Sequence, residues 1–156
     1  MPTFEEKYAE LKKKRDEMEK EFQSLAGELF KEKASGLFEK YPTLKSFGWA
    51  QYTPYFNDGD ECIFGVNDEN IYLEMDGESV DEDSDEHNYG FDAWSINYKI
   101  KHEGENSLTE SERAALDASD FLKTFEEQTL KFMFGDHARI TINRDGTSSV
   151  DGYDHD

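Results

Sequence analysis

A heptad-spaced stripe of apolar residues near the start of the chain constrains the fold most. The residues are separated by alternating steps of four and three, and charged residues fill nearly all the positions between them. Residues at these steps share one face of a helix, so the spacing predicts a long amphipathic helix from a Thr3 cap to about Phe30. A further helical stretch is expected to end at Tyr41, before Pro42. The stripe comprises Phe4, Tyr8, Leu11, Met18, Phe22, Leu25 and Leu29, and only Arg15, which occupies the remaining position, breaks it.

Two uses of this helix are compatible with its pattern. The apolar face can cover a sheet of the same domain, as most amphipathic helices do. Alternatively, the heptad spacing can form a coiled-coil seam through which copies of the chain associate. The second interpretation assigns oligomerisation to Tyr8, Leu11, Met18, Phe22 and Leu25.

The charge of the chain is divided sharply between two segments. Residues 1–45 hold ten acidic and ten basic residues, whereas residues 46–156 hold 27 acidic and seven basic residues and supply the whole net charge of −20. A surface of one sign repels phosphate, which argues against direct binding to nucleic acid or anionic lipid and favours a basic partner. Salt adaptation would load acid over the helix as well, but the helix is balanced.

After residue 46 the apolar period changes from that of a helix to two. Alternation predicts strands at 47–53, at Cys62 to Val66, at 71–76 and at Trp94 to Lys101, with turns at 57–59 and 67–70. Further strands are expected at 138–143 and at 147–150. Between them, a capping box of Thr109 and Glu112 opens a helix that Gly135 ends. The pattern predicts an α+β fold, a mainly antiparallel sheet of four to six strands packed on helices.

The length and composition fit a single domain spanning residues 1–156. It comprises an N-terminal helical segment, residues 1–41, and an acidic α+β core, residues 46–156. The twelve Phe, eight Tyr and two Trp residues supply a core despite the high charge. No apolar run is long enough to span a membrane, and the first residues lack the features of a signal peptide, so a cytoplasmic location is expected. The lone Cys62 cannot form an internal disulfide.

A sixteen-residue acidic segment, 77–92, separates two predicted strands and is the first candidate binding site. Alternating Asp81, Asp83 and Asp85 resemble part of a calcium loop, but Glu86 and Asp92 occupy the places where an EF-hand needs glycine and glutamate. We expect the acidic residues to contact basic groups of a partner, and nearby aromatic residues to anchor the complex. The predicted partner-binding set is Glu74, Asp76, Glu78, Asp81, Glu82, Asp83, Asp85, Glu86, Tyr55, Phe56, Asp58 and Asp60.

The sequence contains no recognisable catalytic or metal-binding motif. The four histidines are scattered, with no i, i+4 pair, and there is neither a phosphate-binding glycine loop nor a nucleophile elbow. We therefore expect no enzymatic activity, no metal and no cofactor. The strongest argument for an enzyme is the aromatic and acidic cluster between Trp49 and Asp60, which could line a pocket.

The segment Trp49-Ala50-Gln51-Tyr52-Thr53-Pro54-Tyr55-Phe56-Asn57-Asp58-Gly59-Asp60 resembles a block found in small uncharacterised acidic proteins of bacteriophages. The resemblance extends over about thirty residues, from Phe38 to Val66, and no activity is attached to the family. It implies a phage origin. Small acidic phage proteins are often inhibitors of host or defence proteins, and some mimic the charge of DNA.

These observations lead to one main hypothesis and two alternatives. The main hypothesis is a non-enzymatic acidic protein that occludes a basic surface, such as a nucleic-acid-binding one, of a host or defence protein by charge mimicry. The first alternative is a structural or assembly protein that oligomerises, for example as a homodimer, through the N-terminal heptad helix. The second alternative is a metal-dependent enzyme.

Overall fold

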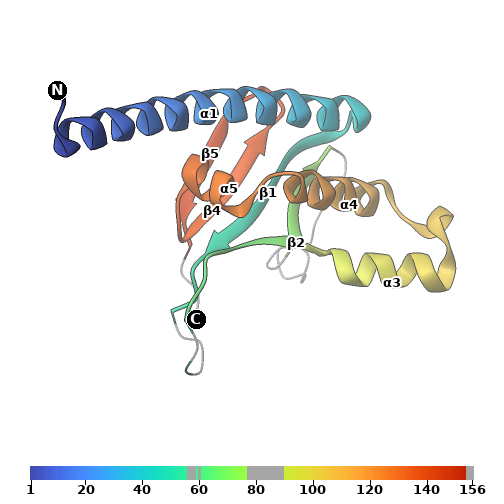
Figure 1. Ribbon diagram of the computed structural model, residues 1–156. Coiled ribbons are helices and arrows are strands. Elements are labelled where there is room, and N and C mark those ends of the chain that lie inside the picture. Colours follow the sequence, from blue (N-terminus) through green and yellow to red (C-terminus); the bar gives the residue numbers. More distant parts are fainter. Residues whose placement is uncertain (56–58, 60, 77–89, 154–156) are drawn as a thin grey trace.

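The computed structural model describes residues 1–55, 59, 61–76 and 90–153. It is an α+β structure in which helices lie over one face of a five-stranded antiparallel sheet of order β3-β2-β1-β4-β5 (Figure 1). This confirms the predicted fold class. In chain order the elements are α1 (Phe4–Lys40), β1 (Leu44–Tyr52), β2 (Gly65–Met75), β3 (Phe91–Asp92), α3 (Ala93–Glu103), the 3-10 helix η1 (Glu105–Ser107), α4 (Glu110–Lys123), α5 (Glu127–Phe134), β4 (Ala138–Asn143) and β5 (Ser148–Gly152).

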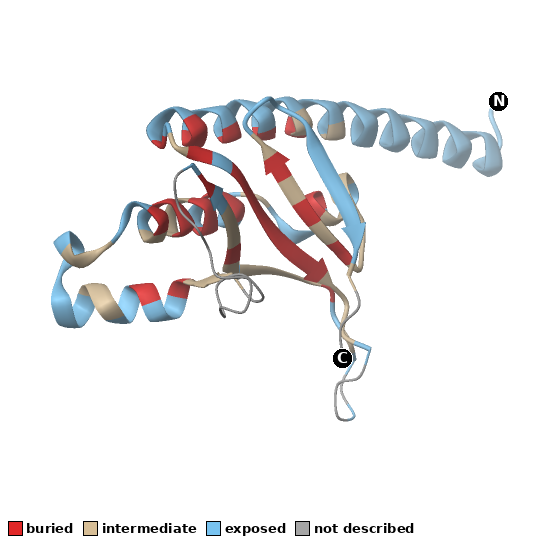
Figure 2. Ribbon diagram, turned by 180° about the vertical axis from the view of Figure 1, so that it is seen from behind, coloured by how far each residue is buried: buried red, intermediate tan, exposed pale blue. Residues whose placement is uncertain are grey.

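Helix α1 is continuous through the two helical segments that the sequence separates. Thr3 caps it as predicted: its hydroxyl accepts from the Glu6 N–H, and the Glu6 carboxylate accepts from the Thr3 N–H. Only the C-terminal part of the helix packs on the sheet, through Ala26, Phe30 and Ala34 among others (Figure 2). These buried residues recur at helical spacing, so their packing on the sheet stabilises the helix across Gly27 and Gly36.

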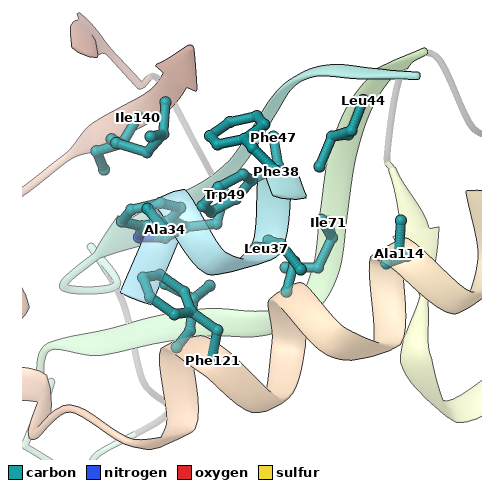
Figure 3. Packing of buried hydrophobic residues seen from close by; sticks show 14 of the residues in the cluster. Ala34, Leu37, Phe38, Leu44, Phe47, Trp49, Ile71, Ala114, Phe121 and Ile140 are labelled. Atoms are coloured by element: carbon teal, nitrogen blue, oxygen red, sulfur yellow. The ribbon is translucent and has the colours of Figure 1, made fainter. Parts of the chain in front are cut away.

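The core lies between the central strand β1 and the helices. Phe47 and Trp49 point toward the helical layer, where Phe38 of α1 and Phe121 of α4 contact Phe47 (Figure 3). The opposite face of β1 carries small residues. A Cβ atom on Gly48 would lie 2.3 Å from the Ile140 carbonyl oxygen of β4, so only glycine fits at this position.

A buried glutamine joins β1 to α5. The Gln51 Nε2 atom donates to the Leu130 carbonyl at 2.9 Å and to the Gly135 carbonyl at 2.7 Å, and the Gln51 Oε1 atom accepts from the Trp49 indole at 3.0 Å. Both N–H groups of the Gln51 side-chain amide and its carbonyl oxygen therefore have hydrogen-bond partners. The interaction holds the C-terminal end of α5 against the sheet.

The helix predicted between Thr109 and Gly135 is two helices. The capping box of Thr109 and Glu112 opens α4, and Gly135, at φ 90°, follows the last residue of α5, both as predicted. The break falls after Thr124, whose hydroxyl donates to the Phe121 carbonyl at 2.6 Å. This local bond competes with the regular helical pattern, so α5 starts again at a new angle.

Only the last two residues of the strand predicted at Cys62 to Val66 belong to a strand, because β2 begins at Gly65 and runs without a break into the strand predicted at 71–76, so the predicted turn between them is wrong. Residues 67–70 remain in the strand, and the shift in pairing with β1 occurs there, between Gly48 and Ala50. The Asn70 amide donates to the Asn67 side chain at 3.1 Å. The turn-forming residues thus make an irregularity within a strand. Cys62 lies before β2 and is half-buried.

The strand predicted at Trp94 to Lys101 is also wrong, because these residues form α3. The Asp92 carboxylate accepts from the Trp94 N–H at 3.0 Å and from the Ser95 hydroxyl at 2.9 Å, and Gly104 ends the helix at φ 86°. The helix buries Ala93 and Ile96 and leaves Trp94 67 % exposed. The alternating apolar residues therefore do not share one buried face.

Candidate interaction surfaces

The N-terminal half of α1 extends beyond the sheet as an exposed arm. All residues from 1 to 22 are exposed, and the arm projects past the strands and the other helices (Figures 1 and 2). Its heptad stripe includes Phe4, Leu11 and Met18, whose side chains are 75 %, 63 % and 70 % exposed. Isolated apolar residues on a surface are ordinary, but a continuous stripe of them marks an interaction site. We call residues Phe4 to Leu29 of this stripe the seam.

The seam borders an open groove against α5. The groove has a volume of about 650 Å³ and is lined by Leu11, Met18 and Phe22 of α1 and by Phe132 and Met133 of α5. Phe132 is 64 % exposed and was not among the residues selected from sequence. Its position outside the buried stripe of α5 is the signal that could have identified it.

The rest of the described chain, from β1 to β5, forms a body whose acidic residues stand on several elements. Four of its acidic side chains pair with lysine: Asp76 with Lys45, Glu69 with Lys123, Glu112 with Lys99, and Asp117 with Lys40, at 2.8–3.0 Å. Residues 46–156 hold 27 acidic and only seven basic residues, so such pairs leave the body strongly negative. The exposed acids include Glu103, Glu105, Asp120, Glu126 and Glu127.

Only three residues of the predicted partner-binding set are described. Glu74 and Asp76 lie at the end of β2, where Glu74 accepts from the Ser46 hydroxyl at 3.4 Å and Asp76 pairs with Lys45. Tyr55 is exposed and its ring stacks on His137, with centroids 5.0 Å apart. Glu74 and Asp76 lie beside the start of β1, whereas Tyr55 follows the end of β1. Tyr55 therefore lies at the opposite end of this strand from the two carboxylates. The remaining members, Phe56, Asp58, Asp60, Glu78, Asp81, Glu82, Asp83, Asp85 and Glu86, lie outside the described residues.

Asp136 is the most heavily hydrogen-bonded carboxylate near Tyr55. Its Oδ1 atom accepts from the Thr53 and His137 N–H groups, each at 2.8 Å, and its Oδ2 atom accepts from the Thr53 hydroxyl at 2.6 Å. Burial alone would raise the pKa of Asp136, but these hydrogen bonds outweigh it and hold the pKa below its usual range. A carboxylate held ionised in this way is a structural acceptor and a poor proton donor. It anchors the turn in which His137 adopts φ 49°.

The face of the sheet opposite the helices carries an aromatic and basic cluster that sequence reasoning missed. The Arg139 guanidinium of β4 lies 3.9 Å from the Tyr72 ring centroid of β2, so the pair spans β1 above Gly48 and Ala50. These contacts depend on cross-strand register, which periodicity alone does not supply.

The described residues supply no group of three or more His, Cys, Asp or Glu side chains able to hold a metal ion. No helix in this part of the chain is long and apolar enough to cross a membrane. The aromatic and acidic cluster suggested as an enzyme pocket is described only in part, and within that part Trp49 is buried in the core.

No protein-family model, no curated protein and no solved structure gives a significant match to this chain.

Proposed function

We propose that this protein acts by binding, with its acidic body occluding a basic surface of another protein by charge mimicry. The proposed partner is a host or defence protein whose basic surface holds nucleic acid, and the proposed setting is the cytoplasm of a bacterium infected by a phage. The observation that carries this proposal is that the net negative charge of the chain lies outside its first 45 residues. Residues 1–45 sum to zero, while residues 46–156 hold the full net charge of −20.

The physical basis is the similarity between clustered carboxylates and a phosphate backbone. Duplex DNA presents one negative charge per roughly 1.7 Å of its axis, and a groove that neutralises those charges with Arg and Lys also attracts carboxylates on a rigid frame. Exposed acids on α3, η1, α4 and α5 belong to such a frame. Complementary charge accelerates association and makes it sensitive to salt. Exposed Tyr55 supplies an aromatic group of the type that anchors interfaces.

The first test is capture of proteins from a bacterial lysate on the immobilised full-length chain at low salt. We expect the retained proteins to be basic and to be released as the salt concentration rises. Replacing Asp81, Asp83 and Asp85 together with asparagine should reduce the retained amount severalfold. Retention that is unchanged by these three substitutions would remove the acidic segment from the proposal.

A matched control separates local charge from total charge. Replacing Glu10, Glu17 and Glu39 of α1 with glutamine removes the same three negative charges from a part of the chain that carries no net charge. We expect this variant to retain the same proteins in the same amount as the unmodified chain. Equal losses in both variants would show that only the net charge matters.

A further inference from the structure

The arm of α1 presents an apolar seam that nothing in the described chain covers. Residues 4–22 form a helix about 28 Å long with every residue exposed. Such a helix is only marginally stable alone in water, because most helical stability comes from packing of the apolar face. The body buries residues of α1 only from Ala26 onward, so it leaves the apolar face of residues 4–22 uncovered. The seam and the adjoining groove therefore require an occupant from outside.

We propose that the occupant is the arm of a second copy of this chain, running antiparallel in a two-stranded coiled coil. In the register that pairs the most seam residues, Leu11 faces Phe22 of the second copy and Tyr8 faces its Leu25. Arg15 faces Met18 of the second copy, and Met18 faces its Arg15. The two-fold axis passes between these two layers. The groove beside α5 receives the middle of the second arm, against Phe132.

Charges on both sides of the seam favour this register. In an antiparallel coiled coil, the residues that flank the seam on one side meet their equivalents on the other helix. Lys7 then meets Glu28 of the second copy, and Lys14 meets its Glu21. On the opposite flank, Lys12 meets Glu19. Symmetry doubles each pair, so all six charged contacts along the seam are between opposite charges. The Lys12 ammonium already lies beside the seam, 4.6 Å from the Tyr8 ring centroid.

The neighbouring antiparallel registers each introduce contacts between like charges and leave seam residues at the ends without a facing residue. A shift of one heptad in one direction brings Glu21 against Glu21 and Glu19 against Glu19 of the second copy. A shift in the other direction brings Lys14 against Lys14 and Lys12 against Lys12. Like charges at such positions destabilise a coiled coil and set its register.

A parallel arrangement is disfavoured by the seam and by the bodies. It stacks Arg15 on Arg15 within the seam and places Lys7 beside Lys12 of the second copy. It also brings two strongly negative bodies side by side. In the antiparallel arrangement, Ala26 of one copy and Ala26 of the other are separated by about 28 Å along the helix axis, so the two bodies lie toward opposite ends of the coiled coil.

The inference does not depend on the proposed mimicry, and its test uses the full chain in sedimentation equilibrium. The unmodified protein should be a dimer at micromolar concentrations, and Leu11→Lys should be monomeric. Lys13→Glu, on the outer face of the arm, is the matched control and should remain dimeric. The fluorescence of buried Trp49 should be the same in all three, since the arm contributes nothing to the core.

Charge reversal then tests orientation. Lys14→Glu alone and Glu21→Lys alone should each raise the dimer dissociation constant about tenfold, because each change turns two attractive contacts into repulsive ones. The double variant restores both contacts only in the antiparallel register and should return the dissociation constant to that of the unmodified chain. A monomeric unmodified protein, a Leu11→Lys dimer or a double variant that is not rescued would each overturn the proposal.

Discussion

Replacing Gln51 with methionine is expected to destabilise the body by about 3 kcal/mol. The two side chains have similar volume and flexibility, so the substitution removes hydrogen bonds with little change in packing. Gln51 is fully buried and makes three hydrogen bonds of 2.7–3.0 Å, two to carbonyl groups and one from the Trp49 indole. Methionine replaces none of them well, because its thioether is only a weak acceptor.

The magnitude follows from the number and burial of the groups that lose a partner. The three hydrogen bonds contribute a net free energy of about 3 kcal/mol, and the buried Trp49 indole N–H left without a partner adds about 1 kcal/mol. The apolar methionine side chain offsets about 1 kcal/mol by its own burial. With a urea dependence of about 2 kcal/mol per molar, typical of a small protein, the unfolding midpoint should fall by about 1.5 M.

Urea unfolding followed by tryptophan fluorescence measures this shift. The protein concentration is kept fixed, because association of the arms would add to the apparent stability. Asn97→Met is the matched control: Asn97 is exposed on α3, and the change should alter the free energy of unfolding by no more than about 0.5 kcal/mol. If Gln51→Met is as stable as the control, the bridge between β1 and α5 does not stabilise the fold.

Three further predictions concern the body. Gly48→Ala should lower the free energy of unfolding by about 2 kcal/mol or more, because its Cβ atom meets the Ile140 carbonyl oxygen; an unchanged thermal midpoint would contradict this. Burial and the adjacent Asp117 carboxylate raise the pKa of Tyr41, so the stability that this raised pKa supplies is complete below about pH 10 and is lost as the pH rises further. Urea midpoints of the unmodified chain from pH 8 to 11 should show this decline. The Tyr41→Phe variant should not show it. The pKa of Asp136 is lowered, so its contribution is complete above about pH 4 and is lost as the pH falls; Asp136→Asn should flatten the acid limb of the same curve, and a limb as steep as that of the unmodified chain would refute this role.

The elements that the sequence predicted well are those with local chemical signals at their ends. The capping boxes at Thr3 and Thr109 and the glycine after α5 are local signals, and each lies at a helix boundary in the structure. The heptad stripe likewise predicted a helix. It could not show whether that helix covers the sheet or forms a seam. The buried residues Ala26 and Phe30 each lie one position after a residue of the stripe, and so on a neighbouring face of the same helix.

The errors occurred where a local pattern had two physical interpretations. The alternation from Trp94 to Ile100 suggested a strand, but capping by Asp92 and a stop at Gly104 favour a helix. The residues at 67–70 have the chemistry of a turn, whereas pairing of Asn67 with Ala50 of β1 and of Asn70 with Asp92 of β3 keeps them within β2. Local capping decides the first case, and pairing between strands decides the second. For the candidate site, the sequence identified the residues of the seam, but their exposure, their proximity to Phe132 and the pairing of Asp76 with Lys45 required the fold.

The central claim is that the acidic body and a nucleic acid compete for the same basic surface. The most direct measurement is fluorescence anisotropy of a labelled DNA duplex bound to the purified basic protein recovered from the lysate, as this chain is added. We expect the anisotropy to fall to the value of free DNA, and the chain concentration needed for this to rise with salt. The fall should be much smaller with the variant in which Asp81, Asp83 and Asp85 are replaced with asparagine. Anisotropy that stays constant, or that rises because all three molecules form one complex, would contradict the claim.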